Sequence, residues 1–580
     1  MLETAVQCVL RYHEQTKHHL NRYARSLGYL DWATQPDPFR RFDGAPQIPL
    51  DHPPLSPELL YDALFTGQPA SAGSLDRHAI SRLFYDSLAI SAWKQAPGAG
   101  RWSLRVNPSS GALHPTEGYL LAGAVEGLGS QAAVYHYSPY AHALEQRVAL
   151  SDDEWASLTS DLPTGAVLVA LTSIHWRESW KYGERAFRYC HHDVGHAIGS
   201  ITFAAATLGC ETRLVTSIGQ DALAALLGTN RQHGIEAEHP DCLLAVFPRG
   251  DSYPAKPPAV DVPTTLLERL ATSEFAGSPN RLSESHHHWP VIDEVARATH
   301  VPADETAVQE GTDEPPSLAL LGAPIERPLP AQQIIRQRRS AVDMDGRTSI
   351  PRETFYRMMA RVSPQRGFPF EVLPWPPCVA LAIFVHRVDD LSSGLYLLVR
   401  SVRHERLLRD ALKPDFLWRR PAECPDGLQL WCLVEADCGS AARTISCHQS
   451  IASEGAFSLG MMADFEPSLR HRGAWFYPRL FWETGLIGQV LYLEAEAAGV
   501  RATGIGCFFD DAMHDLLGIR DRSWQSLYHF TVGGPTDDLR LQTLPPYEHL
   551  QLDEDPPATA PTTEGIAWQT GLNVGPREQS

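Results

Sequence analysis

Small polar residues gather at one turn in the first half of the chain, directly before a strand-like run. Six residues make up this turn and its approach: Arg105, Asn107, Pro108, Ser109, Ser110 and Gly111. Glycine has no β-carbon, so a ligand can approach its backbone closely. Serine hydroxyls and free N–H groups can hold a phosphate or the polar edge of a ring. The pattern predicts a ligand-binding loop, and a capped structural turn is an equal alternative.

A basic run near the start of the second half suits an anion. It holds Arg338, Arg339 and Ser340 within the sequence RQRRSAVDMDG. The planar guanidinium fork matches the oxygens of a phosphate. We interpret the run as a phosphate site, with a solvated basic surface as the alternative.

A glycine-rich turn in the sequence ATGIGCFFDD lies between a strand-like run and a helix. It contains Gly504, Ile505 and Gly506. Backbone N–H groups at such a turn can approach a flat ring without obstruction by side chains. A tight turn with a structural role is the alternative, because a lone pair of glycines is a weak signal.

Lys181 and Tyr182 lie side by side before a long apolar helix. A lysine next to a phenol can depress the pKa of either group and so create a general base. The alternative is a surface lysine beside a packed tyrosine.

Histidines suggest a metal but lack a framework for one. His192 and His196 resemble a zinc-protease motif and would share a helix face. Asp193, however, replaces the longer general-base glutamate, and no third ligand is apparent. The run of three histidines at 286–288 has no ligand framework around it either. We therefore predict no metal site, and keep a metal hydrolase as a minor alternative.

An internal repeat organises the elements that must position these residues. Residues 193–228 align without a gap with 483–518, so that Gly195 meets Gly485 and both copies end in Leu-Leu-Gly. Each copy predicts a long apolar helix, a short strand and a second helix. The long helices have so little polar surface that we expect them to be buried between two halves.

Composition excludes several classes of protein. The chain has 580 residues with 69 acidic and 49 basic side chains, a net charge of −20, so nucleic-acid binding is not expected. Its ten cysteines form no CxxC pair, which is typical of reduced thiols in the cytoplasm. The amino terminus reads as an amphipathic helix and no apolar run could span a bilayer, so we predict a cytoplasmic protein without membrane contact.

Strand-like runs alternate with helices, which indicates an α+β fold with helices against a mostly antiparallel sheet. The predicted organisation has five parts: an N-terminal helical extension (1–70), a first domain (71–255), a Pro-rich and acidic linker of low order (256–325), a second domain (326–550) and a disordered tail (551–580).

The motifs together resemble the nitroreductase superfamily of FMN-dependent enzymes, and within it the SagB-type (ThcOx) dehydrogenase branch. The resemblance rests on residues 107–120, 135–145, 181–189 and 485–534. It implies two fused nitroreductase-like domains, each a mixed, mostly antiparallel sheet flanked by helices, that form a pseudo-dimer. The Pro-Ser-Ser loop occurs only in the first half, and the Arg-Arg-Ser run and glycine turn only in the second. One composite FMN site is therefore expected.

The resemblance also implies a role for each motif residue. The phosphate and ribityl chain of FMN would be bound by Arg338, Arg339, Ser340 and Arg540. The isoalloxazine ring would be covered by Pro108, Ser109, Ser110 and Gly111, and Gly504 and Gly506 would approach its N5 edge. The other expected cofactor-binding residues are Arg105, Asn107 and Ile505. Lys181 and Tyr182 match a pair proposed as the base in azoline-oxidising members. The chain departs from the family where Val342 replaces a frequent arginine, which weakens the phosphate assignment.

The expected activity is that of an FMN-dependent oxidoreductase acting on a small molecule or a modified peptide, such as one containing an azoline heterocycle. One alternative is an NAD(P)H-dependent reductase of nitro compounds or quinones. The other is a non-catalytic binding or scaffold protein with a flavin fold. Fold and cofactor do not decide the substrate. The fused halves would form a pseudo-dimeric monomer, and further oligomerisation stays open.

Overall fold

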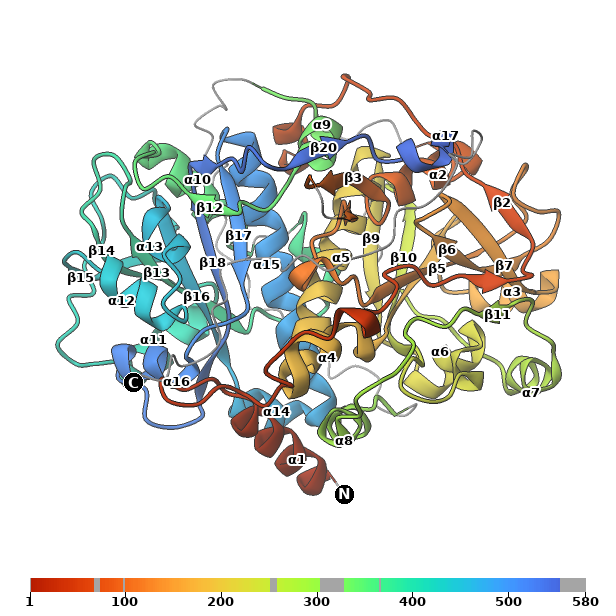
Figure 1. Cartoon of the computed structure of the whole chain (residues 1–580), viewed down its shortest axis with the longest axis horizontal. Coiled ribbons are helices and arrows are strands. Elements are labelled where there is room, and N and C mark those ends of the chain that lie inside the picture. Colours follow the sequence, from red (N-terminus) through yellow and green to blue (C-terminus); the bar gives the residue numbers. More distant parts are fainter. Residues whose placement is uncertain are drawn as a thin grey trace.

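The structure is a computed structural model, and it describes residues 2–66, 73–97, 100–250, 258–302, 328–364 and 367–552. Two antiparallel sheets lie on either side of a pair of long helices (Figure 1). The predicted α+β class is confirmed. No helix among these residues is both long and apolar enough to cross a membrane.

Each half of the chain builds one sheet. The first has the order β2 (Gln47–Pro49), β7 (Ala143–Ala149), β6 (Ala133–Ser138), β5 (Thr116–Ala122), β8 (Val167–Ser173), β10 (His239–Pro248) and β9 (Cys210–Val215). The second has the order β15 (Leu430–Glu435), β14 (Gly394–Leu398), β13 (Val379–Val385), β16 (Phe457–Asp464), β18 (Trp524–Gly533) and β17 (Arg501–Ile505). From β7 and β15 onward the two orders correspond strand for strand, so the halves share one topology.

Short helices cover the outer face of each sheet. Leucines of α3 (Asp152–Leu158), α6 (Gln220–Leu227) and α7 (Thr264–Thr272) pack on the first sheet. Apolar residues of α11 (Val402–Ala411), α12 (Gly439–Ile445) and α16 (Asp510–Leu517) pack on the second. Helices α6 and α16 end the two repeat copies, and each stops at a left-handed glycine, Gly228 at φ +74° and Gly518 at φ +90°. Glycine is favoured there because it has no β-carbon to clash.

The inner faces meet around α5 (Ala186–Thr207) and α15 (Tyr477–Ala497), whose residues are almost all buried. The expectation of two buried long helices is confirmed. Gly195 and Gly485, the pair that the repeat aligns, lie against one another: a β-carbon on Gly195 would be 2.9 Å from the Gly485 α-carbon and would overlap the Trp482 carbonyl oxygen. The helices can approach this closely because neither residue has a side chain.

Gly485→Ala is therefore expected to lower the free energy of unfolding by about 1–3 kcal/mol, as overpacking does elsewhere. The new methyl group would overlap the His192 carbonyl oxygen, and backbone cannot move aside as a side chain can. Thermal denaturation measures the loss. Gly199→Ala is the matched control, because the atoms nearest to its β-carbon would belong to the Gln489 and Leu486 side chains rather than to backbone. A Tm no lower than that of the control would contradict the prediction.

Segments near the two ends of the chain each contact the opposite half. Helix α1 (Leu2–Gln15) contacts α14 (Glu466–Arg472) of the second half and α8 (Pro290–Ala298). Strand β20 (Gln542–Leu544) pairs with β3 (Ile90–Gln95) of the first half, which in turn pairs with β4 (Arg101–Arg105). Each half thus contacts the other through a terminal segment, a helix in one case and a strand in the other.

The remaining elements connect these layers. The helices are α2 (Arg77–Tyr85), α4 (His175–Tyr182), α9 (Ala331–Gln337), α10 (Arg352–Val362), α13 (Ile451–Glu454) and α17 (Glu548–Leu552). Two short strand pairs join β1 (Phe42–Asp43) to β11 (Ser278–Pro279) and β12 (Asp343–Met344) to β19 (Pro535–Thr536).

Two sequence expectations need correction. The predicted low-order linker at 256–325 is wrong for residues 258–302, which form α7 and α8 with Leu266, Leu270, Ile292 and Val295 buried. These apolar residues recur at helical spacing inside an otherwise polar stretch, which the composition concealed. The extension at 1–70 is helical mainly in α1 and otherwise includes β1 and β2. Residues 303–327 and the predicted tail from 553 onward lie outside the described residues.

Candidate functional site

The Arg-Arg-Ser run of the second half contacts the residues that directly precede the Pro-Ser-Ser loop of the first half. Arg338 directly follows α9, and its Nη2 donates hydrogen bonds to the carbonyl oxygens of Arg105 and Val106, each at 3.1 Å. The side chain is only 4% exposed. One guanidinium group therefore fixes the basic run of the second half against the loop that begins at residue 107.

The two arginines keep their charge available for an anion. Arg339 donates to the carbonyl oxygens of Arg336, Arg338 and Ser91. Within the described part of the chain, neither guanidinium group forms an ion pair with a carboxylate. The buried Nε of Arg338 has no hydrogen-bond partner there. Burial, and then the neighbouring charge of Arg338, lowers the pKa of Arg339 to about 10. An anion would relieve this repulsion.

Two further cations belong to this group, and the sequence motifs did not reveal them. Burial lowers the pKa of Lys94 on β3, and the positive charges of Arg339 and Arg501 lower it further. Glu496 is near enough to affect the pKa of both motif arginines but forms no ion pair with either. Lys94 is an isolated lysine in a strand, so only the pairing of β3 with β4 and β20 shows where it lies.

Lys181 and Tyr182 lie directly against Gly111. A β-carbon on Gly111 would be 2.7 Å from the Tyr182 hydroxyl oxygen and 3.0 Å from Lys181 Nζ. Gly111 has φ +62°, a left-handed conformation that glycine adopts without strain. The side chains predicted to act as a base are therefore in contact with the loop predicted to cover a ring.

The pKa values of the pair correct the expectation that either group could become the base. Burial lowers the pKa of Lys181, which favours its neutral amine. Burial raises the pKa of Tyr182 well above its ordinary value, and the nearby Glu178 adds to the increase. A phenol that keeps its proton cannot act as a general base. Lys181 is thus the base candidate and Tyr182 a proton donor or packing partner.

Asp193, which lies in the zinc-protease-like motif of the sequence, holds the Pro-Ser-Ser loop through hydrogen bonds. The backbone N–H of Ser110 donates to its carboxylate oxygens at 3.1 and 3.2 Å, and the Ser110 hydroxyl donates at 3.2 Å. Asp193 is 1% exposed, and burial raises its pKa to about 7. A buried acid that titrates near neutral pH therefore lies beneath the loop.

This arrangement predicts a pH-dependent stability difference between Asp193→Asn and the unaltered protein. Between the unfolded pKa near 4 and the folded pKa near 7, the native state holds a proton that the unfolded state has lost. Stability of the unaltered protein should therefore fall as pH rises through that window, by up to about 1.4 kcal/mol per unit of pKa shift. The amide of the variant cannot ionise. The stability of Asp193→Asn relative to the unaltered protein should therefore rise with pH across this window and stay constant above it. Denaturation at several pH values measures this, and a constant difference would contradict it.

The glycine turn is tied to the basic run through Tyr492. The Tyr492 hydroxyl accepts a hydrogen bond from Gly504 N–H at 3.0 Å and lies 2.9 Å from the Ser340 hydroxyl. Tyrosine rings cover both glycines: β-carbons at Gly504 and Gly506 would overlap Tyr528 and Tyr189 respectively. The turn therefore needs glycine for protein packing, whether or not a ligand also approaches it. Ile505, between them, is buried.

Three predicted residues have different surroundings. Arg105 is 2% exposed and donates to the carbonyl oxygens of Pro38 and Thr116, so it supports the loop from inside. Asn107 is buried, and its Oδ1 has no hydrogen-bond partner in the described chain. The side chain of Arg540 is 82% exposed and pairs with Asp538. The structure does not bring Arg540 into contact with the basic group.

The histidine pair of the false metal motif is buried and neutral. His192 Nε2 lies 3.0 Å from the Leu527 carbonyl oxygen, and His196 Nε2 lies 3.2 Å from the Tyr528 hydroxyl. Burial lowers the pKa of both imidazoles, that of His196 to about 3. These contacts explain the histidines as interior hydrogen-bonding groups between α5 and β18.

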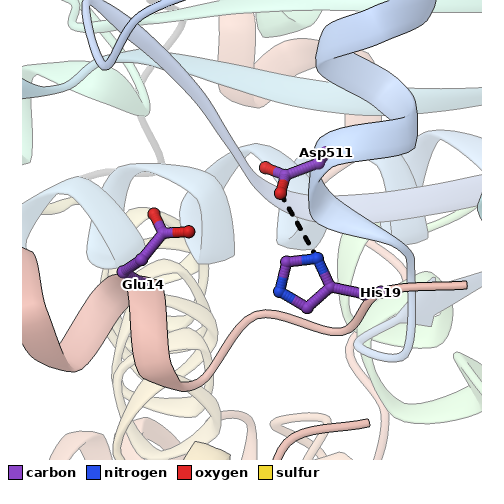
Figure 2. A group of neighbouring side chains, drawn as sticks. All are labelled: Glu14, His19 and Asp511. Atoms are coloured by element: carbon purple, nitrogen blue, oxygen red, sulfur yellow. Dashed lines mark ion pairs between the residues drawn. The ribbon is translucent and has the colours of Figure 1, made fainter. Parts of the chain in front are cut away.

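One cluster elsewhere has metal-ligand side chains. Figure 2 shows Glu14, His19 and Asp511, whose ligand atoms lie within 4.8 Å of one another. Lys17 Nζ, however, forms ion pairs with both carboxylates, at 3.0 Å from Glu14 and 2.9 Å from Asp511. The ammonium group pairs with both carboxylates, so the cluster joins the N-terminal segment to α16.

Comparisons with known proteins point to one family. Residues 435–534 match the sequence profile described as the nitroreductase family. A candidate nitroreductase of Methanocaldococcus jannaschii is 29% identical over 127 residues, which are 21% of this chain and 62% of that protein. The chain thus spans less than two thirds of that relative. Residues 435–534 of the second half are therefore similar in sequence to the nitroreductase family.

Solved structures extend the likeness in fold. A candidate nitroreductase of Anabaena variabilis is 19% identical, with a TM-score of 0.63 over 91% of this chain and 99% of that one. At this identity the likeness concerns the fold alone, and it includes both halves. The microcin synthetase McbBCD complex of E. coli is 17% identical over 43% of this chain and 94% of that one, with a TM-score of 0.25, which is too low to support any argument.

Proposed function

We propose that this chain is an FMN-dependent oxidoreductase of the nitroreductase family, with one flavin site built from both halves. The observation that carries the proposal is the contact of Arg338 with the carbonyl oxygens of Arg105 and Val106. It joins a cationic group from one half to a small-residue loop from the other. Duplication of an ancestral domain accounts for the shared strand order and for the Gly195–Gly485 contact.

The residues present suit the parts of FMN. Arg338, Arg339 and Lys94 offer positive charge that no carboxylate neutralises by an ion pair among the described residues, and the Arg338 Nε lacks a partner. A phosphate meets such a group well. Ser109, Ser110 and Gly111 and the turn at 504–506 would line the ring. When bound, FMN supplies two-electron transfer, while the protein supplies orientation and electrostatics.

Lys181 is the group that handles a proton. Its pKa is lowered by burial, so the neutral amine is present at a lower pH than for an ordinary lysine. Nζ lies 3.0 Å from the position that a β-carbon on Gly111 would take, beside the loop that would cover the ring. From there it can accept a proton from a substrate that is being oxidised. Tyr182 keeps its own proton and can donate a hydrogen bond to a substrate oxygen or nitrogen.

The substrate class follows from the base. A neutral lysine beside the loop favours oxidation of a C–H bond, as in azoline-type heterocycles of the SagB-type branch. An NAD(P)H-dependent reductase of nitro compounds or quinones is the second candidate, and there the same lysine would return a proton. The two candidates are separated by adding either a dihydro-heterocycle or NAD(P)H under anaerobic conditions and following the absorbance of the bound cofactor. Reduction by the heterocycle supports the first candidate, and reduction by NAD(P)H supports the second.

The deciding experiment is an absorption spectrum of the purified full-length protein before and after incubation with FMN and desalting. The proposal expects a bound flavin spectrum with one FMN per chain. A protein that stays colourless after incubation contradicts it and favours the scaffold alternative. Two FMN per chain would contradict the single composite site and leave the cofactor assignment standing.

A further inference from the structure

Two cysteine side chains meet beside the glycine turn. The Sγ atoms of Cys447 and Cys507 lie 2.7 Å apart, and both residues are partly exposed. This separation is longer than an S–S bond of about 2.05 Å, but it brings the two sulfur atoms into direct contact. No other pair of cysteine sulfurs makes contact among the residues that the structure describes. The sequence distance of sixty residues between them concealed the pair.

The backbone on both sides of the pair is fixed. Gln449 Nε2 donates to the Cys507 carbonyl oxygen at 3.0 Å, and Phe509 N–H donates to the Ile445 carbonyl oxygen at 2.7 Å. The loop between α12 and α13 is thus held against the segment between β17 and α16 (Figure 1). The sulfur atoms meet because hydrogen bonds on either side hold their segments together.

The loop also holds an unfavourable conformation at the cysteine. Cys447 has φ +53° and the next residue, His448, has φ +62°. A left-handed conformation costs roughly 1–2 kcal/mol for each non-glycine residue. Such conformations persist only where the surroundings enforce them, and they cluster at functional sites. Here the enforced geometry directs the Cys447 sulfur toward Cys507.

The pair lies at the proposed flavin site. Cys507 follows Gly506, whose carbonyl oxygen accepts a hydrogen bond from Tyr189 at 3.0 Å. The Tyr189 ring in turn packs against the ring of Tyr182, with the ring centroids 4.4 Å apart. Burial, followed by the neighbouring Cys507, raises the pKa of the Cys447 thiol.

We propose that Cys447 and Cys507 form a redox-active dithiol–disulfide pair that exchanges electrons with the flavin of the proposed site. Oxidation breaks two S–H bonds, forms one S–S bond and releases two protons and two electrons, and oxidised flavin is the acceptor of both electrons. Reduced flavin reverses the step. The flavin exchange rests on the proposed function, whereas formation of the disulfide does not.

The disulfide is tested without any flavin. The full-length protein is equilibrated in mixtures of reduced and oxidised glutathione, alkylated, digested and analysed by mass spectrometry. We expect loss of two of the ten alkylatable thiols and a cross-linked peptide pair containing Cys447 and Cys507. Cys447→Ser and Cys507→Ser should each abolish that cross-link, whereas Cys424→Ser, also partly exposed, should keep it. Full alkylation of both thiols in every mixture overturns the proposal.

Electron exchange is tested by anaerobic titration of the pre-oxidised, FMN-loaded protein with dithionite. The unaltered protein should consume twice as many electrons per flavin as Cys447→Ser or Cys507→Ser. Equal consumption overturns the exchange even if the disulfide forms. Failure to bind FMN overturns the proposed function instead. The alkylation experiment then still decides whether Cys447 and Cys507 form a disulfide.

Discussion

Lys181→Met is expected to lower kcat by about 10²- to 10⁴-fold while FMN stays bound, because general-base catalysis contributes about that much. Methionine keeps the length of the side chain but cannot take a proton. In the structure Nζ lies against Gly111, and its pKa is lowered by burial. Stopped-flow reduction of the bound flavin by substrate measures the effect directly, apart from product release.

The pH profile separates a proton-transfer role from a structural one. In the unaltered protein, kcat/KM should rise with pH through the lowered pKa of Lys181, because only the neutral amine acts as a base. This limb should disappear in Lys181→Met and persist in Tyr182→Phe, since the Tyr182 phenol stays protonated. Lys413→Met, at a half-buried lysine beside Gly518, serves as the control. A normal rate and an unchanged profile in Lys181→Met would return the lysine to a packing role.

Arg339→Ala is expected to weaken FMN binding by about 10- to 100-fold. A hydrogen bond to a charged group contributes about 1.5–3 kcal/mol, and each 1.4 kcal/mol is tenfold in affinity. Arg339 is held by backbone carbonyl groups rather than by a carboxylate, so its charge is available to a phosphate. Fluorescence titration of the apoprotein with FMN measures the affinity, and Arg470→Ala, whose side chain on α14 is 46% exposed, is the matched control.

Riboflavin, which lacks the phosphate, shows whether the loss is specific. The preference of the unaltered protein for FMN over riboflavin should largely vanish in Arg339→Ala, while riboflavin affinity changes little. Equal weakening of both ligands would mean that the arginine only supports the fold, through its bond to the Ser91 carbonyl oxygen. Unaltered affinity for both would exclude the basic run from the site.

Much of the candidate site could be predicted from local sequence. The loop at 105–111, the basic run at 338–340 and the pair Lys181–Tyr182 each combine residue types whose chemistry is independent of fold. Their mutual contact could not be predicted, because Arg338 and Arg105 are more than two hundred residues apart. The opposite pKa shifts of Lys181 and Tyr182 could not be predicted either, because burial is their main cause. The sequence does not show how deeply a single side chain is buried.

Asp193 shows why a motif can mislead. Its neighbours His192 and His196 suggested a metal. In the structure its carboxylate instead accepts a hydrogen bond from the backbone N–H of Ser110, 83 residues earlier in the chain. Lys94 shows the reverse: no motif marks it, and strand pairing alone brings it to the arginines. The linker prediction failed for a related reason, because average composition overlooked the spaced leucines of α7.

The amino-acid sequence by itself determined the α+β class, the two buried helices and the residue types of the site, because these depend on periodicity and on chemistry carried by each side chain. Only the tertiary structure decided which of those residues meet, which acid lies under the loop and which cysteines face one another. Packing, backbone hydrogen bonds and removal of water act between segments that are distant in the chain. Those forces have no signature at any single position.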